Sequence, residues 1–157
     1  KERAEALHIK SLADLAAHPD LRIGGDFEIF SRPEWRAVAS AYGLGAMKRR
    51  QYQPDFLYRA VMSGDADVVS AFSSDGRIAR YDLVILEDPK SALPPYDAML
   101  LVGPAHAHDA KFIAALKPLI GSISLTLMQQ ANLRVDRDQD KQTPAATAAW
   151  MDQRLPH

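Results

Sequence analysis

Two side chains of opposite charge stand in a turn between a predicted strand and a predicted helix. The strand covers residues 21–25 and ends in two glycines, and Pro33 opens an amphipathic helix. Glycines let the backbone turn tightly and approach a bound molecule, and a helix start presents N–H groups that favour anions. In this turn Arg32 has the fork geometry that binds a carboxylate, and Glu28 could fix Arg32 or face a cation.

The same two residues also suit an ordinary ion pair on the protein surface. Glu28 and Arg32 stand on either side of a helix entrance, where such pairs are common and contribute little to stability. The spacing alone therefore favours a surface ion pair, and a ligand site needs support from the rest of the chain.

Composition narrows the class of protein. The chain has 157 residues, 47% hydrophobic and 25% charged, as expected for one globular domain with a sizeable core. A net charge of −1 provides no basic surface for nucleic acid, and cysteine is absent, which excludes disulfides and thiolate chemistry. No apolar run approaches the roughly 20 residues of a membrane span. Because the chain begins with Lys1, we expect it to be an excised or processed piece.

Apolar periodicity predicts alternating helices and strands, which is typical of an α/β protein with a mostly parallel sheet. Strands are predicted at residues 21–25, 67–72, 83–86 and 98–102. Helices are predicted around residues 9–16, 33–42, 54–63 and 112–120, and again from Thr143. Residues 123–127 alternate like a strand, but Ser124 is a good N-cap and a helix through Ala131 is the favoured interpretation. Residues 48–50 are expected to be a solvated loop, and residues 134–142 a polar linker.

The remaining polar residues offer little support for catalysis or metal binding. Ser73 and Asp75 follow the buried strand predicted at 67–72, so we expect their loop to lie beside the Glu28/Arg32 turn. A hydrolase using Ser73 lacks the G-x-S-x-G elbow, and Glu28 paired with Asp75 as acid and base has no further support. His106 and His108 have no plausible third metal ligand nearby. Nucleotide-binding loops are absent, so the sequence predicts no catalytic residue, no metal and no cofactor.

Five short motifs occur in an order that resembles a known family. They are Phe27-Glu28-(x3)-Arg32-Pro33, Tyr42-Gly43-Leu44, the run from Ser70 to Ile78, Leu83-(x2)-Leu86-Glu87-Asp88, and Pro94-Pro95-Tyr96. The chain resembles the substrate-binding proteins of ABC importers for glycine betaine, choline and related osmoprotectants. Leu119, Gly121, Ile123, Met128, Asn132 and Val135-Asp136 continue the likeness, which covers nearly the whole chain.

The resemblance implies a two-lobed periplasmic-binding-protein fold of type II, with the ligand held in the cleft. Residues 1–95 would form lobe two, residues 96–103 the crossover strand, and residues 104–157 a helical segment belonging with lobe one. Most of lobe one would then lie outside these 157 residues, and we expect this chain alone to bind ligand weakly.

The resemblance also implies a set of binding residues. Glu28 and Arg32 would be the polar contacts, and Phe72 and Tyr96 two walls of an aromatic cage. The family usually has Tyr where this chain has Phe72. A quaternary ammonium group donates no conventional hydrogen bond, so aromatic faces suit it, at roughly 0.5 to 2 kcal/mol each. Without the resemblance, Phe72 would be interpreted as strand core and Tyr96 as a tyrosine packed at a prolyl turn.

The predicted function is binding of a quaternary-ammonium osmoprotectant and its delivery to an ABC transporter permease. Arg32 favours a betaine over choline, because only the betaine has a carboxylate. We expect a periplasmic or otherwise extracytoplasmic protein that meets the membrane only through the permease, with no nucleic acid partner and no enzymatic activity. Two alternatives stay open: a small α/β hydrolase-like enzyme, and a permease-fused ligand-sensing domain of the same fold.

Overall fold

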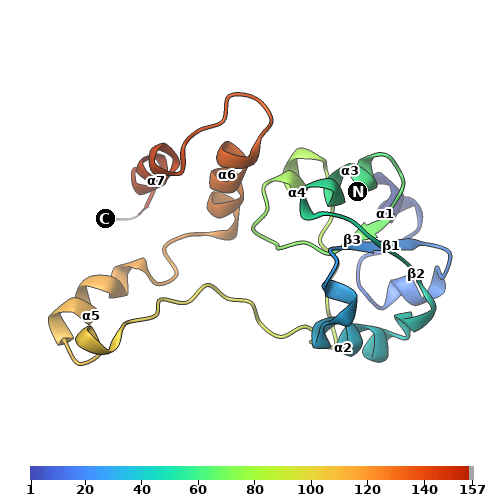
Figure 1. The fold of residues 1–157 in the computed structure, drawn as a ribbon, viewed down its shortest axis with the longest axis horizontal. Coiled ribbons are helices and arrows are strands. Elements are labelled where there is room, and N and C mark those ends of the chain that lie inside the picture. Colours follow the sequence, from blue (N-terminus) through green and yellow to red (C-terminus); the bar gives the residue numbers. More distant parts are fainter. Residues whose placement is uncertain (156–157) are drawn as a thin grey trace. The chain divides into compact units, whose positions relative to one another are not determined.

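The computed structural model describes residues 1–155, which form two compact units. Unit 1 consists of residues 1–72 and 78–95. Unit 2 is described over residues 73–77 and 96–155. Figure 1 traces the helices and strands of both units along the chain.

A small parallel sheet organises unit 1. Its strands are β1 (Arg22–Gly25), β2 (Lys48–Gln51) and β3 (Val68–Val69), arranged in the order β2-β1-β3. Parallel neighbours need crossover connections, and α2 (Pro33–Tyr42) and α3 (Leu57–Met62) provide them. Figure 1 shows α2 and α3 on opposite sides of the sheet. From the central strand β1 the chain passes to β2 at one edge of the sheet and then crosses to β3 at the other edge. The direction of the connections changes at β1, which is therefore the switch point of the sheet.

Local sequence signals explain where α2 begins and ends. Pro33 occupies the first helical position, where its missing N–H costs nothing, and Gly43 ends the helix in the left-handed conformation at φ 69°. Trp35, Val38 and Tyr42 recur at helical spacing and are all buried. The helix predicted over residues 33–42 is confirmed with these bounds.

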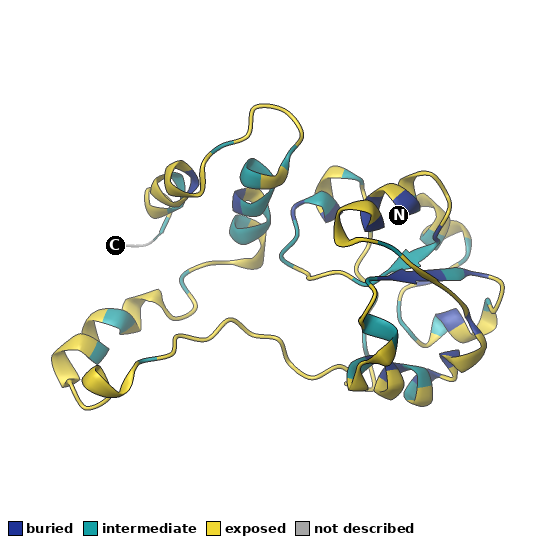
Figure 2. Ribbon diagram, viewed as in Figure 1, coloured by how far each residue is buried: buried dark blue, intermediate teal, exposed yellow. Residues whose placement is uncertain are grey.

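The remaining elements of unit 1 are short helical segments. They are α1 (Glu2–Ala6), η1 (Asp14–Ala17), η2 (Ile29–Ser31), η3 (Leu44–Ala46) and η4 (Pro54–Phe56). One further helix, α4 (Arg77–Arg80), runs across the boundary between the units. The core that these elements enclose consists of Ile9, Leu15, Leu21, Ile23, Trp35, Val38, Tyr42, Leu44 and Met47. Figure 2 shows buried positions on the sheet and on the elements around it.

Unit 2 is helical over its described residues. It contains η5 (Pro104–His106), α5 (Ala110–Leu116), η6 (Lys117–Leu119), α6 (Leu125–Asp136) and α7 (Pro144–Asp152). Three side chains accept hydrogen bonds at helix starts, namely Asp109 for α5, Ser124 for α6 and Thr143 for α7. The cap at Ser124 confirms the helix that was favoured over a strand. Among residues 1–155, every helix is too short or too polar to cross a lipid bilayer.

Two apolar runs that were predicted to be strands have no sheet partner within residues 1–155. Residues 83–86 make no ladder there, and the pairing next to them is a single parallel bridge between Ser11 and Glu87. Residues 98–102 belong to unit 2, whose described residues contain no strand. An apolar run becomes a strand only beside a neighbour that takes up its backbone hydrogen bonds. The strand predicted at residues 83–86 was therefore wrong, whereas the crossover strand at residues 96–103 stays a prediction.

Other predicted boundaries also need correction. The helix expected around residues 9–16 is absent, because the Asp14 carboxylate accepts the backbone N–H groups of Lys10 (2.9 Å) and Ser11 (2.8 Å) and bends the chain into a turn. Residues 48–50 are not a loop but part of the exposed edge strand β2, where charged side chains discourage pairing with other chains. The linker expected at residues 134–142 begins later, because α6 extends through Asp136.

Candidate ligand-binding site

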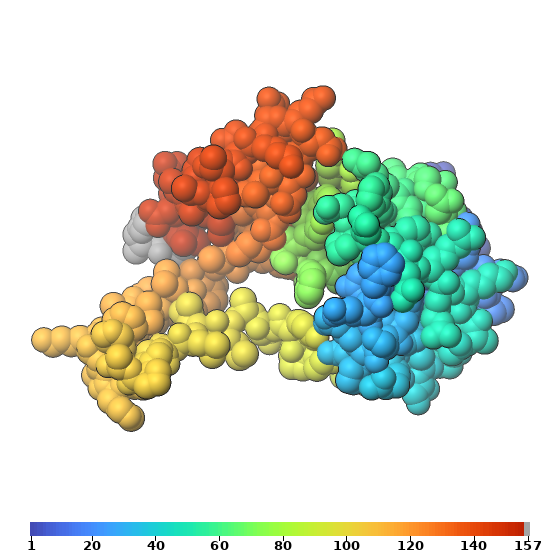
Figure 3. All heavy atoms as spheres, in the orientation of Figure 1, coloured from blue at the N-terminus to red at the C-terminus, as the bar shows by residue number. Residues whose placement is uncertain are grey.

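The Glu28/Arg32 turn lies directly after the carboxyl end of β1, at the switch point of the parallel sheet. Ligands of α/β proteins bind at such positions, because the loops on either side diverge there. Gly25 is required at this point, since a Cβ atom on it would lie 2.1 Å from Ile29 Cγ2. The close approach packs η2 tightly against the end of the strand. Figure 3 shows the blue segment that carries this turn at the surface of unit 1.

Asp26 shapes the turn through its side chain. Its Oδ1 atom accepts hydrogen bonds from the backbone N–H groups of Glu28 (3.0 Å) and Ile29 (2.7 Å). At the other end, Arg36 Nη1 donates to the carbonyl oxygen of Ser31 at 2.6 Å. The turn is therefore held at both ends by side chains that the sequence reasoning missed. The sequence did contain a signal for Asp26. An aspartate just before a helix start commonly accepts the backbone N–H groups two and three residues further along the chain.

Glu28 and Arg32 form an ion pair across one turn of the chain. Arg32 Nη2 donates to Glu28 Oε2 at 2.6 Å, and the side chains of Arg32 and Glu28 are 45% and 71% exposed, respectively. The hydrogen bond and the negative charge of Glu28 raise the pKa of Arg32, which keeps the guanidinium charged. Within the described residues, Nε and Nη1 of Arg32 donate no hydrogen bond. The pair thus fixes one nitrogen of the guanidinium and leaves N–H groups on Nε and Nη1, which point to different sides of the group, to donate to an anionic ligand.

The two predicted cage residues are both exposed aromatic side chains. Phe72 follows β3 in unit 1 and is 71% exposed, so its interpretation as buried strand core is wrong. Tyr96 is 62% exposed and belongs to unit 2. The structure brings Glu28 and Arg32 together. It describes Phe72 and Tyr96 within separate units, and their joint role in one site stays a prediction.

The loop expected to supply hydrolase chemistry has a structural role in unit 2. Arg77 donates to the Asp75 carboxylate through its backbone N–H (2.9 Å) and through Nη2 (2.7 Å). Gln129 of α6 donates to the carbonyl oxygen of Ser73 at 2.6 Å. These contacts join residues 73–77 to α6 and to each other. Asp75 therefore forms an ion pair with Arg77.

One member of the histidine pair, His106, packs against a neighbouring ring. His106 stacks on the ring of Phe112, with 4.6 Å between ring centroids. Within residues 1–155, no group of three or more His, Cys, Asp or Glu side chains is arranged to hold a metal ion.

Comparison with known proteins identifies the class to which this fold belongs. The family model for the substrate-binding domain of ABC-type glycine betaine transport systems, OpuAC, matches residues 1–153. A solved structure described as a glycine betaine/carnitine/choline ABC transporter matches with a TM-score of 0.83 and 31% identity, over 98% of this chain and 57% of that one. The chain therefore belongs to this family of substrate-binding domains, and the α/β fold with a parallel sheet flanked by helices is confirmed.

Curated relatives come from several bacteria. A "Carnitine transport binding protein OpuCC" of Listeria monocytogenes is 32% identical over 65% of this chain and 33% of its own length. A "Glycine-betaine-binding protein" of Pseudomonas aeruginosa is 29% identical over 95% of this chain and 52% of its own length. An "Ergothioneine transport permease/ergothioneine binding protein EgtU" of Helicobacter pylori is 26% identical over 87% of this chain and 25% of its own length. The chain thus spans about half, or less, of the length of these relatives.

Proposed function

We propose that this chain is the ligand-binding part of an ABC importer system and that it binds a small zwitterion with a quaternary ammonium group. Glycine betaine, carnitine and ergothioneine, which the names of the relatives mention, each combine a trimethylammonium group with a carboxylate. Choline, which the name of the matching solved structure mentions, has the first group without the second. A receptor for this ligand class needs aromatic faces for the cation and a fork-shaped donor for the carboxylate.

The observation that carries the proposal is the geometry of Arg32. Its guanidinium lies at the carboxyl end of β1, is held through Nη2 by Glu28, and keeps Nε and Nη1 without partners among the described residues. The N–H groups that Glu28 leaves available can donate to the oxygens of a carboxylate. Phe72 and Tyr96 are the proposed aromatic walls, and their exposed rings fit that role. Delivery to a permease on the outer side of the membrane is part of the same proposal, as is the lack of enzymatic turnover.

Calorimetric titration of the full gene product with glycine betaine, carnitine and choline tests the proposal. The unaltered protein should bind with a Kd of about micromolar or below, as aromatic and charged contacts together allow. Arg32→Ala should weaken betaine and carnitine about tenfold or more and choline much less, because choline lacks the carboxylate. Phe72→Ala should weaken all three ligands, since all three have the trimethylammonium group.

Matched controls separate these effects from general damage. Arg59→Ala removes another exposed arginine of unit 1, whose guanidinium lies 5.6 Å from the ring of Phe56. Phe56→Ala removes another exposed aromatic side chain, 47% accessible. Neither control should change affinity for any of the three ligands. Equal losses for choline and betaine in Arg32→Ala would contradict the carboxylate role of Arg32.

The second candidate is a permease-fused ligand-binding domain of the same fold. The observation that favours it is the Helicobacter pylori relative, whose name joins a permease and a binding protein, and which this chain covers over 25% of its length. The two candidates share the ligand site and differ in the rest of the gene product. Membrane fractionation of cells that express the full gene separates them, because a fused protein stays with the membrane after a high-salt wash.

A further inference from the structure

We infer that Asp26 is a positioning residue, which holds the turn so that Arg32 can meet a ligand carboxylate. The inference rests on the proposed function. Asp26 lies between Gly25, at the end of β1, and the residues that form the ion pair. Its side chain is the only one among the described residues that bonds to the backbone N–H groups at the start of η2.

The turn needs such a side chain because η2 is too short to satisfy its backbone N–H groups by its own hydrogen bonds. η2 consists of Ile29–Ser31, and a helix of this length satisfies almost none of its own N–H groups. The Asp26 carboxylate takes two of them, at 3.0 Å from Glu28 and 2.7 Å from Ile29. These bonds fix the backbone of Glu28, and the Glu28 carboxylate in turn holds Nη2 of Arg32 at 2.6 Å. Asp26 thereby sets the direction of the guanidinium through one intervening residue.

The charge of Asp26 and its hydrogen bonds should have opposite effects on betaine affinity. Substitutions can therefore separate the two contributions. Asp26 is one of the negative charges that raise the pKa of Arg32, so it also repels an incoming carboxylate. If Asp26 acted through its charge alone, removing that charge would strengthen betaine binding. If Asp26 positions the turn, losing its hydrogen bonds should weaken betaine binding despite the lower repulsion.

Two substitutions in the full gene product distinguish these roles. Asp26→Ala removes the charge and the acceptor, and it should weaken glycine betaine about fivefold or more while choline changes little. Asp26→Asn keeps an acceptor oxygen without the charge, and it should retain or slightly improve betaine affinity. Hydrogen–deuterium exchange should show faster amide exchange at Glu28 and Ile29 in the alanine variant, and near-native exchange in the asparagine variant.

Asp14→Ala is the matched control, because Asp14 makes the same kind of bond to the backbone N–H groups of Lys10 and Ser11 elsewhere in unit 1. It should change local exchange at those two residues and leave the ratio of betaine to choline affinity unaltered. The inference is overturned if Asp26→Ala leaves exchange at Glu28 and Ile29 unchanged, or if it weakens both ligands equally. An unaltered protein that binds neither ligand overturns the proposed function and the ligand role of Asp26 together, while the exchange data still show whether Asp26 holds the turn.

Discussion

The two units of this protein have similar fractions of apolar residues but bury them very differently. Unit 1 encloses its apolar side chains around a sheet, and Leu15 and Leu44 are 0% and 1% exposed. In unit 2, Ala131 and Thr147 are buried, whereas Met99 is 78% and Leu101 is 89% exposed. Within the described residues, a parallel sheet with crossover helices encloses the apolar side chains of unit 1, whereas the short helices of unit 2 enclose few of theirs.

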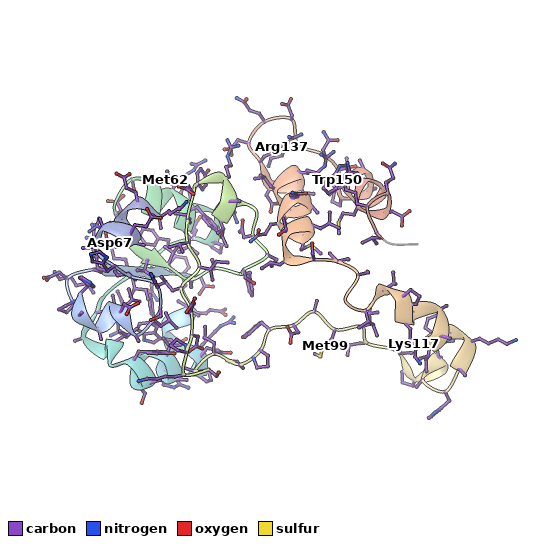
Figure 4. The ribbon with its side chains drawn as sticks, turned by 180° about the vertical axis from the view of Figure 1, so that it is seen from behind. Met62, Asp67, Met99, Lys117, Arg137 and Trp150 are labelled. Atoms are coloured by element: carbon purple, nitrogen blue, oxygen red, sulfur yellow. The ribbon has the colours of Figure 1, made fainter. Side chains whose placement is uncertain are left out.

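The charged side chains of the two units also make different kinds of contact. In unit 1 the Asp67 side chain, 3% exposed, accepts hydrogen bonds from the backbone N–H of Arg22 at 2.8 Å and from its Nε at 3.0 Å, and Arg3 lies 2.8 Å away. In unit 2 two guanidiniums lie over the ring of Trp150, with the Cζ atoms of Arg134 at 4.5 Å and Arg154 at 4.3 Å from the ring centroid. Figure 4 labels Asp67 and Trp150. Each unit has one of the two tryptophans, Trp35 and Trp150, so fluorescence can report on each unit separately.

The largest expected effect compares two leucines. Leu15→Ala should lower the free energy of unfolding of unit 1 by about 2–5 kcal/mol, because it opens a cavity in a closed core. Leu101→Ala, at a side chain that is 89% exposed, should change stability by about 0.5 kcal/mol or less. Denaturant titration measures both, with Trp35 emission for Leu15→Ala in unit 1 and Trp150 emission for Leu101→Ala in unit 2. Equal destabilisation by the two substitutions would show that the contrast in burial does not govern stability.

An intermediate effect concerns the buried carboxylate of unit 1. Burial favours the neutral form of Asp67, but hydrogen bonds from Arg22 and the charges of Arg22 and Arg3 outweigh it, so its pKa lies below the ordinary 3.8. A lowered pKa in the folded state stabilises the protein above pH 3.8, and this contribution disappears as the pH falls through the folded-state value. Asp67→Asn should cost about 1–3 kcal/mol at pH 7 and flatten the acid side of the stability profile.

Asp20→Asn is the matched control for that substitution. Its side chain is 96% exposed and lies 3.3 Å from Lys48, so removing its charge should cost about 0.5 kcal/mol or less. The measurement is denaturant unfolding followed by Trp35 between pH 3 and 7. A steep acid loss of stability that persists in Asp67→Asn would assign the pH dependence to other groups.

The smallest expected effect is in unit 2. Thr143 Oγ1 accepts the backbone N–H of Ala146 at 3.1 Å and caps α7, which carries Trp150. Thr143→Ala should destabilise this helix by about 1 kcal/mol, and Thr143→Ser should restore most of the loss. Trp150 emission should report the change, and Trp35 emission should not. A shift of equal size in both signals would mean that the two units unfold together.

Part of the candidate site follows from neighbouring residues alone. The ion pair between Glu28 and Arg32 was predicted from a spacing of four residues, and the structure confirms it at 2.6 Å. Asp26 was missed, although its hydrogen bonds are equally local, because an aspartate in a turn has several common roles. The exposed position of Phe72 was also missed, because an apolar run before a turn suggests a buried strand whether or not neighbours cover it.

What the sequence determined by itself are the features that depend on a few adjacent residues. These include the bounds of α2 between Pro33 and Gly43, and the N-caps at Ser124 and Thr143. Only the tertiary structure decided which apolar runs became strands: Arg22–Gly25 found partners on both sides, whereas residues 83–86 and 98–102 formed no ladder with any described residue. The physical reason is that a helix closes its hydrogen bonds within its own segment, whereas a strand must find a partner elsewhere.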